Sequence, residues 1–263
     1  MTRPGTATAD VGAGHGHHLH FHGHSLVHRL PAHAKLVALL GFVVTVVLTP
    51  RTAFAAYAVY LALVLVAQRC SRVPFGYYAK RMVVEAPFVV FALLMPFVAT
   101  GPRVEVGPLQ LSESGLLSAW ALLAKGTLGV MASLVLATTT EPRHVVGGLE
   151  RLRLPHQLVQ IMGFMVRYLE VVTGEMARMK VARESRGFQA RSLRSWPVLA
   201  TTAGALFIRS YERGERVHLA MLSRGYTGQL PVTHPMTATA EQWRRAGILP
   251  VAALATLLMA VAL

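Results

Sequence analysis

Five long apolar runs limit most strongly what this chain can fold into. They cover residues 35–49, 52–68, 83–99, 115–140 and 246–263. A transmembrane α-helix needs about 20 predominantly apolar residues to cross a bilayer. The first two runs are shorter than this, which suggests helices flanked by locally thinned lipid. Because 53% of the residues are hydrophobic and only 14% are charged, we expect an all-α, polytopic membrane protein with about five transmembrane helices.

Positive charges are distributed unevenly between the apolar runs. Residues 69–82 contain four Lys or Arg and no acid, and residues 141–245 contain sixteen against eight Glu, whereas 50–51 and 100–114 together contain two. Cytoplasmic loops carry the excess of cations. We therefore expect residues 1–34, 69–82 and 141–245 on the cytoplasmic side of a cell membrane. Contact with anionic lipid then accounts for the excess of 26 Lys and Arg over 12 Asp and Glu without a nucleic-acid partner.

This topology divides the chain into four parts. They are a His-rich cytoplasmic tail at 1–34, a four-helix transmembrane region at 35–140, a cytoplasmic insert at 141–245 and a last transmembrane helix at 246–263. The tail has no apolar core of the kind found in signal peptides, so the first hydrophobic helix is expected to direct insertion. Cys70 is the single cysteine, which excludes an intrachain disulfide.

The insert contains two long helical patterns that each end in glycine. The first begins at Pro155, and its apolar residues alternate between spacings of four and three, which is typical of an amphipathic helix with one narrow seam. The seam residues are Leu158, Met162, Met165, Leu169, Val172, Met176 and Met179. The same spacing then reaches Arg186, just before Gly187. The second pattern opens with the apolar stretch 196–208, interpreted as a buried or interfacial helix or as a re-entrant segment, and ends at Gly225.

The two helix ends repeat one motif at a constant offset of 38 residues. The matching pairs are Ala182 and Ala220, Ser185 and Ser223, Arg186 and Arg224, Gly187 and Gly225, and Phe188 and Tyr226. An arginine in the last turn followed by glycine is common at ordinary helix ends. Capping alone does not require the serine, the aromatic residue or the repetition. We therefore expect both ends to dock on a partner, with each guanidinium forked onto a carboxylate or a backbone carbonyl.

The insert resembles that of the transmembrane T component of energy-coupling factor transporters, and most closely the cobalt/nickel branch. The residues that carry the resemblance are Leu154, Pro155, Leu158, Val159, Ile161, Arg167, Tyr168, Glu175, Arg178, Met179, Ala182, Arg186 and Gly187, with Ser223–Tyr226 as the second arginine motif. The resemblance extends roughly from Ser25 to the last span. It departs near the start, where "LPAHAKL" lacks the family's Asp-Pro pair and has His33 at a position where a cation is common.

The resemblance implies a subunit that couples ATP hydrolysis to the import of cobalt or nickel. Two cytoplasmic P-loop ATPases would bind the helix ends through Arg186 and Arg224, beside the alanines and serines of the repeated motif. Gly187 and Gly225 would let the chain turn sharply there. A separate substrate-binding membrane protein, the S component, would lie on the apolar surface of the two helices. The adaptable part of that surface would be Met162, Met165, Met176 and Met179, although ordinary helix packing explains these residues equally well.

No catalytic motif accompanies these helices. The sequence has no GxxxxGK[ST] phosphate loop and no HExxH zinc motif. We therefore expect a subunit that is not an enzyme and binds no cofactor of its own, with ATP hydrolysis on the partner ATPases.

A histidine-rich segment precedes the first apolar run. Its histidines within residues 15–28 are His15, His17, His18, His20, His22, His24 and His28. Imidazoles in a flexible, Gly-containing segment bind Ni²⁺, Co²⁺, Cu²⁺ or Zn²⁺ with little selectivity. We interpret the segment as an accessory tail that receives or buffers metal, or as a neutral polar extension. It favours cobalt or nickel as the transported ion without choosing between them. Two alternatives stay open: a T component shared among vitamin-binding partners, and a membrane-anchored metal-buffering protein without a transport role.

Overall fold

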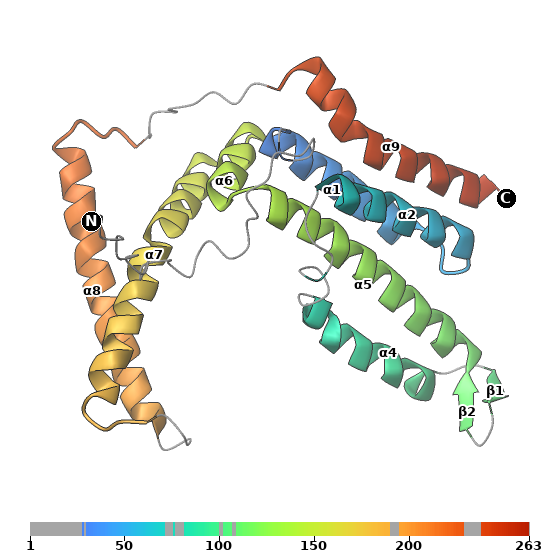
Figure 1. The fold of residues 1–263 in the computed structure, drawn as a ribbon, viewed down its shortest axis with the longest axis horizontal. Helices are drawn as coiled ribbons and strands as arrows, with labels where there is room; N and C mark the ends of the chain where they lie inside the picture. Colours follow the sequence, from blue (N-terminus) through green and yellow to red (C-terminus); the bar gives the residue numbers. More distant parts are fainter. Residues whose placement is uncertain are drawn as a thin grey trace, which may run out of the picture. The chain divides into compact units, whose positions relative to one another are not determined.

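The fold is seen in a computed structural model of the chain (Figure 1). The structure describes residues 28, 30–71, 76, 82–99, 102–106, 109–189, 195–228 and 238–262. They form two compact units. The smaller unit is built from two long helices, α7 (His156–Glu184) and α8 (Trp196–Leu222).

The larger unit combines elements that precede and follow these two helices in the sequence. It consists of α1 (Ala32–Leu48), α2 (Phe54–Ser71), the 3-10 helix η1 (Met82–Glu85), α4 (Ala86–Val98), β1 (Arg103–Val106), β2 (Leu109–Ser112), α5 (Glu113–Thr139), α6 (Pro142–Arg151) and α9 (Ala240–Ala262). Strands β1 and β2 pair antiparallel in a short hairpin between α4 and α5. The sequence patterns did not predict this hairpin. The predicted cytoplasmic insert, residues 141–245, is therefore split between the two units. Helix α6 and the start of α9 belong to the larger unit.

Three helices within the described residues are long and apolar enough to cross a membrane: α2, α5 and α9. Helix α1 and the segment Met82–Val98 are also apolar but shorter. These five correspond to the five apolar runs of the sequence. Many large apolar side chains along them are exposed, which suits contact with lipid and not with water. The prediction of an all-α, polytopic membrane protein is confirmed.

The core of the larger unit lies where α1, α2, α5 and α9 meet. Its buried side chains include Phe42, Val46, Tyr57, Tyr60, Val64, Leu128 and Met131. Small residues allow close helix approach, as is usual in membranes. A Cβ atom added at Gly41 would lie 3.2 Å from the Pro250 Cβ, and one at Gly148 would lie 2.9 Å from the His33 backbone nitrogen. Gly148 therefore lets α6 pack directly against the start of α1.

Lys125 lies near the middle of α5, where a cation in an apolar run needs a partner. Its Nζ donates to the Val47 carbonyl oxygen at 2.7 Å. Helix α1 is shorter than α5, so its last carbonyl groups end beside the middle of α5 and have no partner within their own helix. Lys125 satisfies one of these carbonyls and thus has a structural role at the end of α1.

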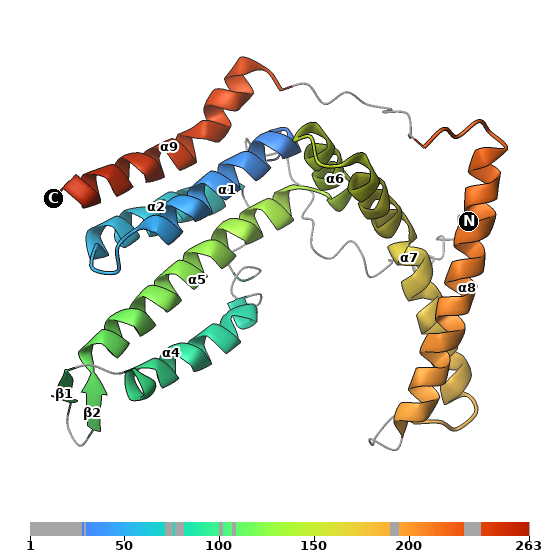
Figure 2. The ribbon, with the colours of Figure 1, turned by 180° about the vertical axis from the view of Figure 1, so that it is seen from behind.

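The two helices of the smaller unit run antiparallel. Glu175 in the second half of α7 accepts a hydrogen bond from Arg209 near the middle of α8, and Gln160 near the start of α7 contacts Tyr226 just beyond the end of α8. Figure 2 shows the same pair from behind. The first half of α8 is the stretch 196–208, and no residue of α8 is buried. Within the chain itself this stretch is therefore not buried, and its contact with a membrane or a partner stays a prediction. Pro155 caps α7 one position before the helix begins, and not within its first turn as the sequence suggested.

Candidate functional site on two matching helix ends

The first tip, which we define as residues 182–188, closes α7 with a glycine in the left-handed backbone region. Gly187 has φ = +78°. The Phe188 N–H donates to the Arg183 carbonyl at 3.1 Å, and the Gly187 N–H donates to the Glu184 carbonyl at 3.0 Å. This pair of bonds is the Schellman motif, which satisfies carbonyl groups that the helix leaves free. A side chain at Gly187 would strain this conformation.

The second tip, residues 220–226, repeats this geometry at the end of α8. Gly225 has φ = +80°. The Tyr226 N–H donates to the Met221 carbonyl at 3.0 Å, and the Gly225 N–H donates to the Leu222 carbonyl at 3.0 Å. The two tips therefore match in backbone conformation as well as in sequence.

The serines and alanines of the motif also take part in both tips. The Ser185 hydroxyl donates to the Ala182 carbonyl at 3.1 Å, and the Ser223 hydroxyl donates to the Ala220 carbonyl at 3.0 Å. These bonds satisfy further carbonyls of the last turn. Each serine therefore also stabilises its last helical turn, and its contact with a partner stays a prediction.

The two arginines project from tips at opposite ends of the antiparallel pair. Arg186 and Arg224 are both exposed, and neither guanidinium has a hydrogen bond or ion pair with another described residue. Because α8 has 27 residues and rises 1.5 Å per residue, the tips are separated by a distance on the order of 40 Å. The smaller unit thus exposes two arginines on matching helix caps, one at each end of the helix pair.

Most of the chain matches one known protein family. The family named CbiQ and described as cobalt transport protein matches residues 23–236. This match covers both helix tips and most of the apolar runs. The chain belongs to this family.

Curated relatives place the family among the transmembrane components of energy-coupling factor transporters. The transmembrane protein EcfT of Listeria innocua is 27% identical over 221 residues, covering 78% of this chain and 82% of its own length. The EcfT protein of Bacillus selenitireducens is 28% identical, with coverage of 78% and 81%. The cobalt transport protein CbiQ of Rhodobacter capsulatus is 28% identical, with coverage of 77% and 81%. The predicted family of T components is thus confirmed.

In this T component the second tip has an anchor that the sequence did not predict. The Tyr226 hydroxyl donates to Gln160 Oε1 at 2.9 Å, and Gln160 Nε2 donates to the Gly228 carbonyl oxygen at 2.9 Å. Gln160 belongs to α7, so these bonds tie the end of α8 to the start of its neighbour. Phe188, at the matching position of the first tip, has no hydroxyl and so cannot form this link.

Between the tips, one carboxylate joins the two helices of the T component. Glu175 accepts hydrogen bonds from Arg178 on its own helix and from Arg209 on α8, both at 2.6 Å. Its side chain is only 17% exposed. These two hydrogen bonds hold the pKa of the Glu175 carboxyl below its usual range. Glu175 and Arg178 were noted only for the family resemblance, and nothing in the sequence pairs them with Arg209.

The four methionines of the predicted coupling surface have different degrees of exposure. Met165 is 67% exposed and Met176 is 52% exposed, whereas Met162 and Met179 are half-buried. The most exposed apolar residues between the start of α7 and Met176 follow helical spacing and form a stripe, which we call the α7 stripe. It consists of Leu158, Ile161, Met165, Leu169 and Met176. This surface of the T component is apolar, and no described residue covers it.

The predicted accessory metal ligands lie outside the described residues. They are His15, His17, His18, His20, His22 and His24. Among the residues that the structure does describe, no group of three His, Cys, Asp or Glu is placed to hold a metal ion. The role of the histidine segment stays a prediction.

Proposed function

We propose that the chain is the coupling subunit of an ATP-driven transporter that imports cobalt or nickel. It transmits the motion of two P-loop ATPase subunits to a separate substrate-binding membrane protein. The observation that carries this proposal is the pair of matching tips. Arg186 and Arg224 each project from a Schellman cap, and the two caps have the same geometry and lie at opposite ends of one helix pair. Two copies of one surface suit two copies of one partner.

Each arginine is suited to a charge-assisted contact with an ATPase. A guanidinium presents five N–H donors in a rigid fork that matches a carboxylate or a pair of carbonyls. The Schellman cap fixes the backbone beneath it, so little freedom is lost when the contact forms. Closure of the ATPase pair on ATP would then pull on two points roughly 40 Å apart and change the crossing of α7 and α8.

The α7 stripe suits the substrate-binding membrane protein. An exposed row of apolar side chains at helical spacing is the kind of surface that packs into a hydrophobic groove, and thioethers adapt to a partner that moves. The ATPases act in the cytoplasm, which agrees with the excess of positive charge in residues 141–245.

Cobalt or nickel is favoured as the cargo by two observations. The family is described by cobalt transport, and a segment of the chain that precedes the first span is rich in imidazole. The EcfT relatives are named without a substrate, which leaves the shared vitamin T component as the second candidate.

The test is ATP-dependent uptake of radiolabelled cobalt and nickel in cells that express the chain with its ATPase and substrate-binding partners. We expect the double variant Arg186→Glu with Arg224→Glu to abolish uptake, and deletion of residues 15–28 to leave most of it. The matched control is Arg213→Glu with Arg216→Glu, which reverses two exposed charges on α8 away from both tips. If the deletion abolishes uptake and the tip variant does not, the chain is a metal-buffering protein and the coupling mechanism is wrong. Uptake of a vitamin in place of either metal would identify the shared T component.

A further inference from the structure

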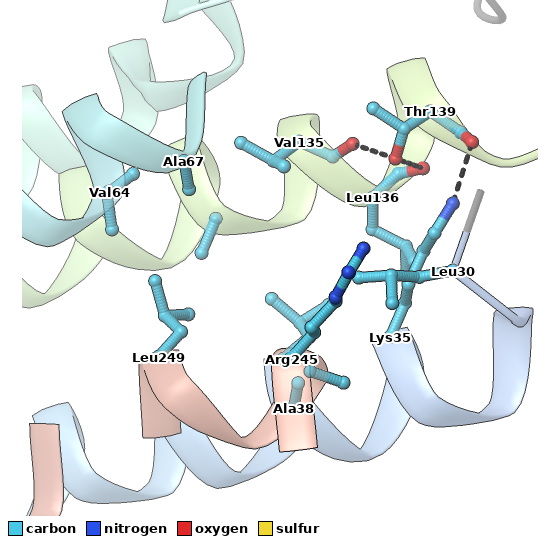
Figure 3. Close-up of a pocket in the computed structure, with 13 residues that line it drawn as sticks. Leu30, Lys35, Ala38, Val64, Ala67, Val135, Leu136, Thr139, Arg245 and Leu249 are labelled. Atoms are coloured by element: carbon cyan, nitrogen blue, oxygen red, sulfur yellow. Dashed lines mark hydrogen bonds between the residues drawn. The ribbon is translucent and has the colours of Figure 1, made fainter. Parts of the chain in front are cut away.

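A small cavity lies inside the larger unit, between α1, α2, α5 and α9. Its volume is about 160 Å³. Most of its wall is aliphatic, with Val64, Val135, Leu136 and Leu249 among the lining residues (Figure 3). A dry cavity of about 150 Å³ accepts a guest the size of benzene, whereas sites for drug-sized ligands begin at roughly 300 Å³. The cavity therefore fits a short piece of a larger apolar molecule, and not a whole soluble ligand.

Two cations line the same cavity. Lys35 is only 7% exposed, and its Nζ donates to the Thr139 carbonyl at 2.9 Å and to Thr140 Oγ1 at 3.1 Å. An ammonium group has three donors, so one N–H remains after these two bonds. Figure 3 shows the Arg245 side chain in the same region as Lys35 and Thr139.

The charge at this end of the cavity is positive overall. Arg245 donates one hydrogen bond to Glu241, which leaves further donors of its guanidinium free. Glu241 does not line the cavity; the Arg245 and Glu241 side chains are 54% and 60% exposed, so water screens both charges of this ion pair, whereas Lys35 is buried. A site with two cations and one screened carboxylate is complementary to a singly charged phosphate diester.

Lys35 and Arg245 lie at one end of the helix bundle, where contacts with a phospholipid headgroup are expected. Lys35 is in the first turn of α1, Thr139 ends α5 and Arg245 is in the second turn of α9, so all three belong to one end of the helix bundle. Trp243 is partly exposed at the same end, and tryptophan is enriched at membrane interfaces. The aliphatic wall leads away from this end into the apolar part of the bundle.

We infer that this cavity binds one anionic phospholipid. A segment of an acyl chain lies against the aliphatic wall, and the phosphate faces Lys35 and Arg245. The lipid joins the ends of α1, α5 and α9. This site is independent of the ATPase and cargo assignments, because none of its residues belongs to either tip or to the α7 stripe.

The test is native mass spectrometry of the full chain released from nanodiscs that contain equal amounts of phosphatidylglycerol and phosphatidylcholine with identical acyl chains. We expect one phosphatidylglycerol to be retained. Arg245→Gln keeps the size of the side chain and removes its charge, so retention should fall about fivefold. Arg244→Gln is the matched control, since Arg244 is exposed and does not line the cavity. Equal retention by the two glutamine variants would overturn the headgroup assignment.

The acyl-chain part is tested by filling the cavity. Ala67→Phe places a ring in the wall of the cavity on α2 and should abolish retention, whereas Ala62→Phe on the exposed side of the same helix should not. Full retention by Ala67→Phe would show that no chain enters the cavity. Glycerol 1-phosphate is added as a soluble competitor, and displacement of the lipid by it at equal concentration would identify a simple anion site. If Ala67→Phe does not fold, as judged by gel filtration and circular dichroism, the arginine pair decides the proposal.

Discussion

The two tips share a sequence motif and a cap, but they differ in what holds them. Each ends in a Schellman motif around a glycine with positive φ. Among the described residues, the second tip is hydrogen-bonded to the neighbouring helix through the Tyr226 hydroxyl and Gln160, and the first tip has no such bond. The cap depends on a few consecutive residues, so a repeated motif reproduces it. The Tyr226–Gln160 hydrogen bond joins residues 66 positions apart, so repeating the motif does not reproduce this bond. The Tyr226–Gln160 hydrogen bond is thus the difference that the described residues show between the two tips.

Charge reversal at the tips is expected to have the largest effect. Arg186→Glu and Arg224→Glu should each weaken binding of the ATPase subunits at least tenfold, because a hydrogen bond to a charged group contributes about 1.5–3 kcal/mol and the new carboxylate repels its partner. Titration of the full chain with the ATPase subunits in detergent measures this, with Arg213→Glu as control. The comparison predicts similar losses at both tips. Normal binding after either single change would mean that the matching caps do not have matching roles.

Replacing the capping glycines should have the next largest effect. Gly187→Ala and Gly225→Ala force an alanine into the left-handed region, at a cost of about 1–2 kcal/mol. The matched control is Gly214→Ala in the interior of α8, where a Cβ meets nothing within 4 Å and alanine should stabilise the helix by up to about 1 kcal/mol. Hydrogen exchange of the amides at both helix ends measures the local free energy of opening. Stabilisation at either tip would contradict the cap geometry.

The tie itself can be removed or transferred. Tyr226→Phe removes one hydrogen bond and should lower the opening free energy of the second tip by about 1 kcal/mol, while the first tip stays unchanged. Phe188→Tyr makes the first tip look like the second in sequence, and we expect no gain there because the tie also needs a partner such as Gln160. Hydrogen exchange at both tips again provides the measurement. If Tyr226→Phe lowered the opening free energy of both tips equally, the Tyr226–Gln160 hydrogen bond would not be specific to the second tip.

The tips and the spans were predictable because their causes are local. A left-handed glycine after an arginine is determined within one helical turn, and the five apolar runs reflect composition over about 20 residues. The hairpin at 103–112 was missed because its strands have four residues each, too few for a clear alternating pattern. The contacts Tyr226–Gln160, Glu175–Arg209 and Lys35–Thr139 join residues 66, 34 and 104 positions apart. A single sequence carries no pattern that pairs such distant positions.

The smallest expected effect is a pH dependence that touches both tips alike. Hydrogen bonds from Arg178 and Arg209 lower the pKa of Glu175 in the folded chain, so its ionised form stabilises the α7–α8 crossing above the usual glutamate pKa of about 4.3. This stabilisation is lost as the pH falls from there through the lowered folded-state pKa. Hydrogen exchange between about pH 5 and pH 3 should therefore show α7 and α8 loosening together, and salt should weaken the effect because both arginines are largely exposed. Glu175→Gln should remove the pH dependence, whereas Glu184→Gln, whose partner Lys180 lies on the same helix, should keep it. Loosening of the first tip alone would mean that Glu175 acts within α7 through Arg178, and that the Tyr226–Gln160 tie is what holds the two helices together.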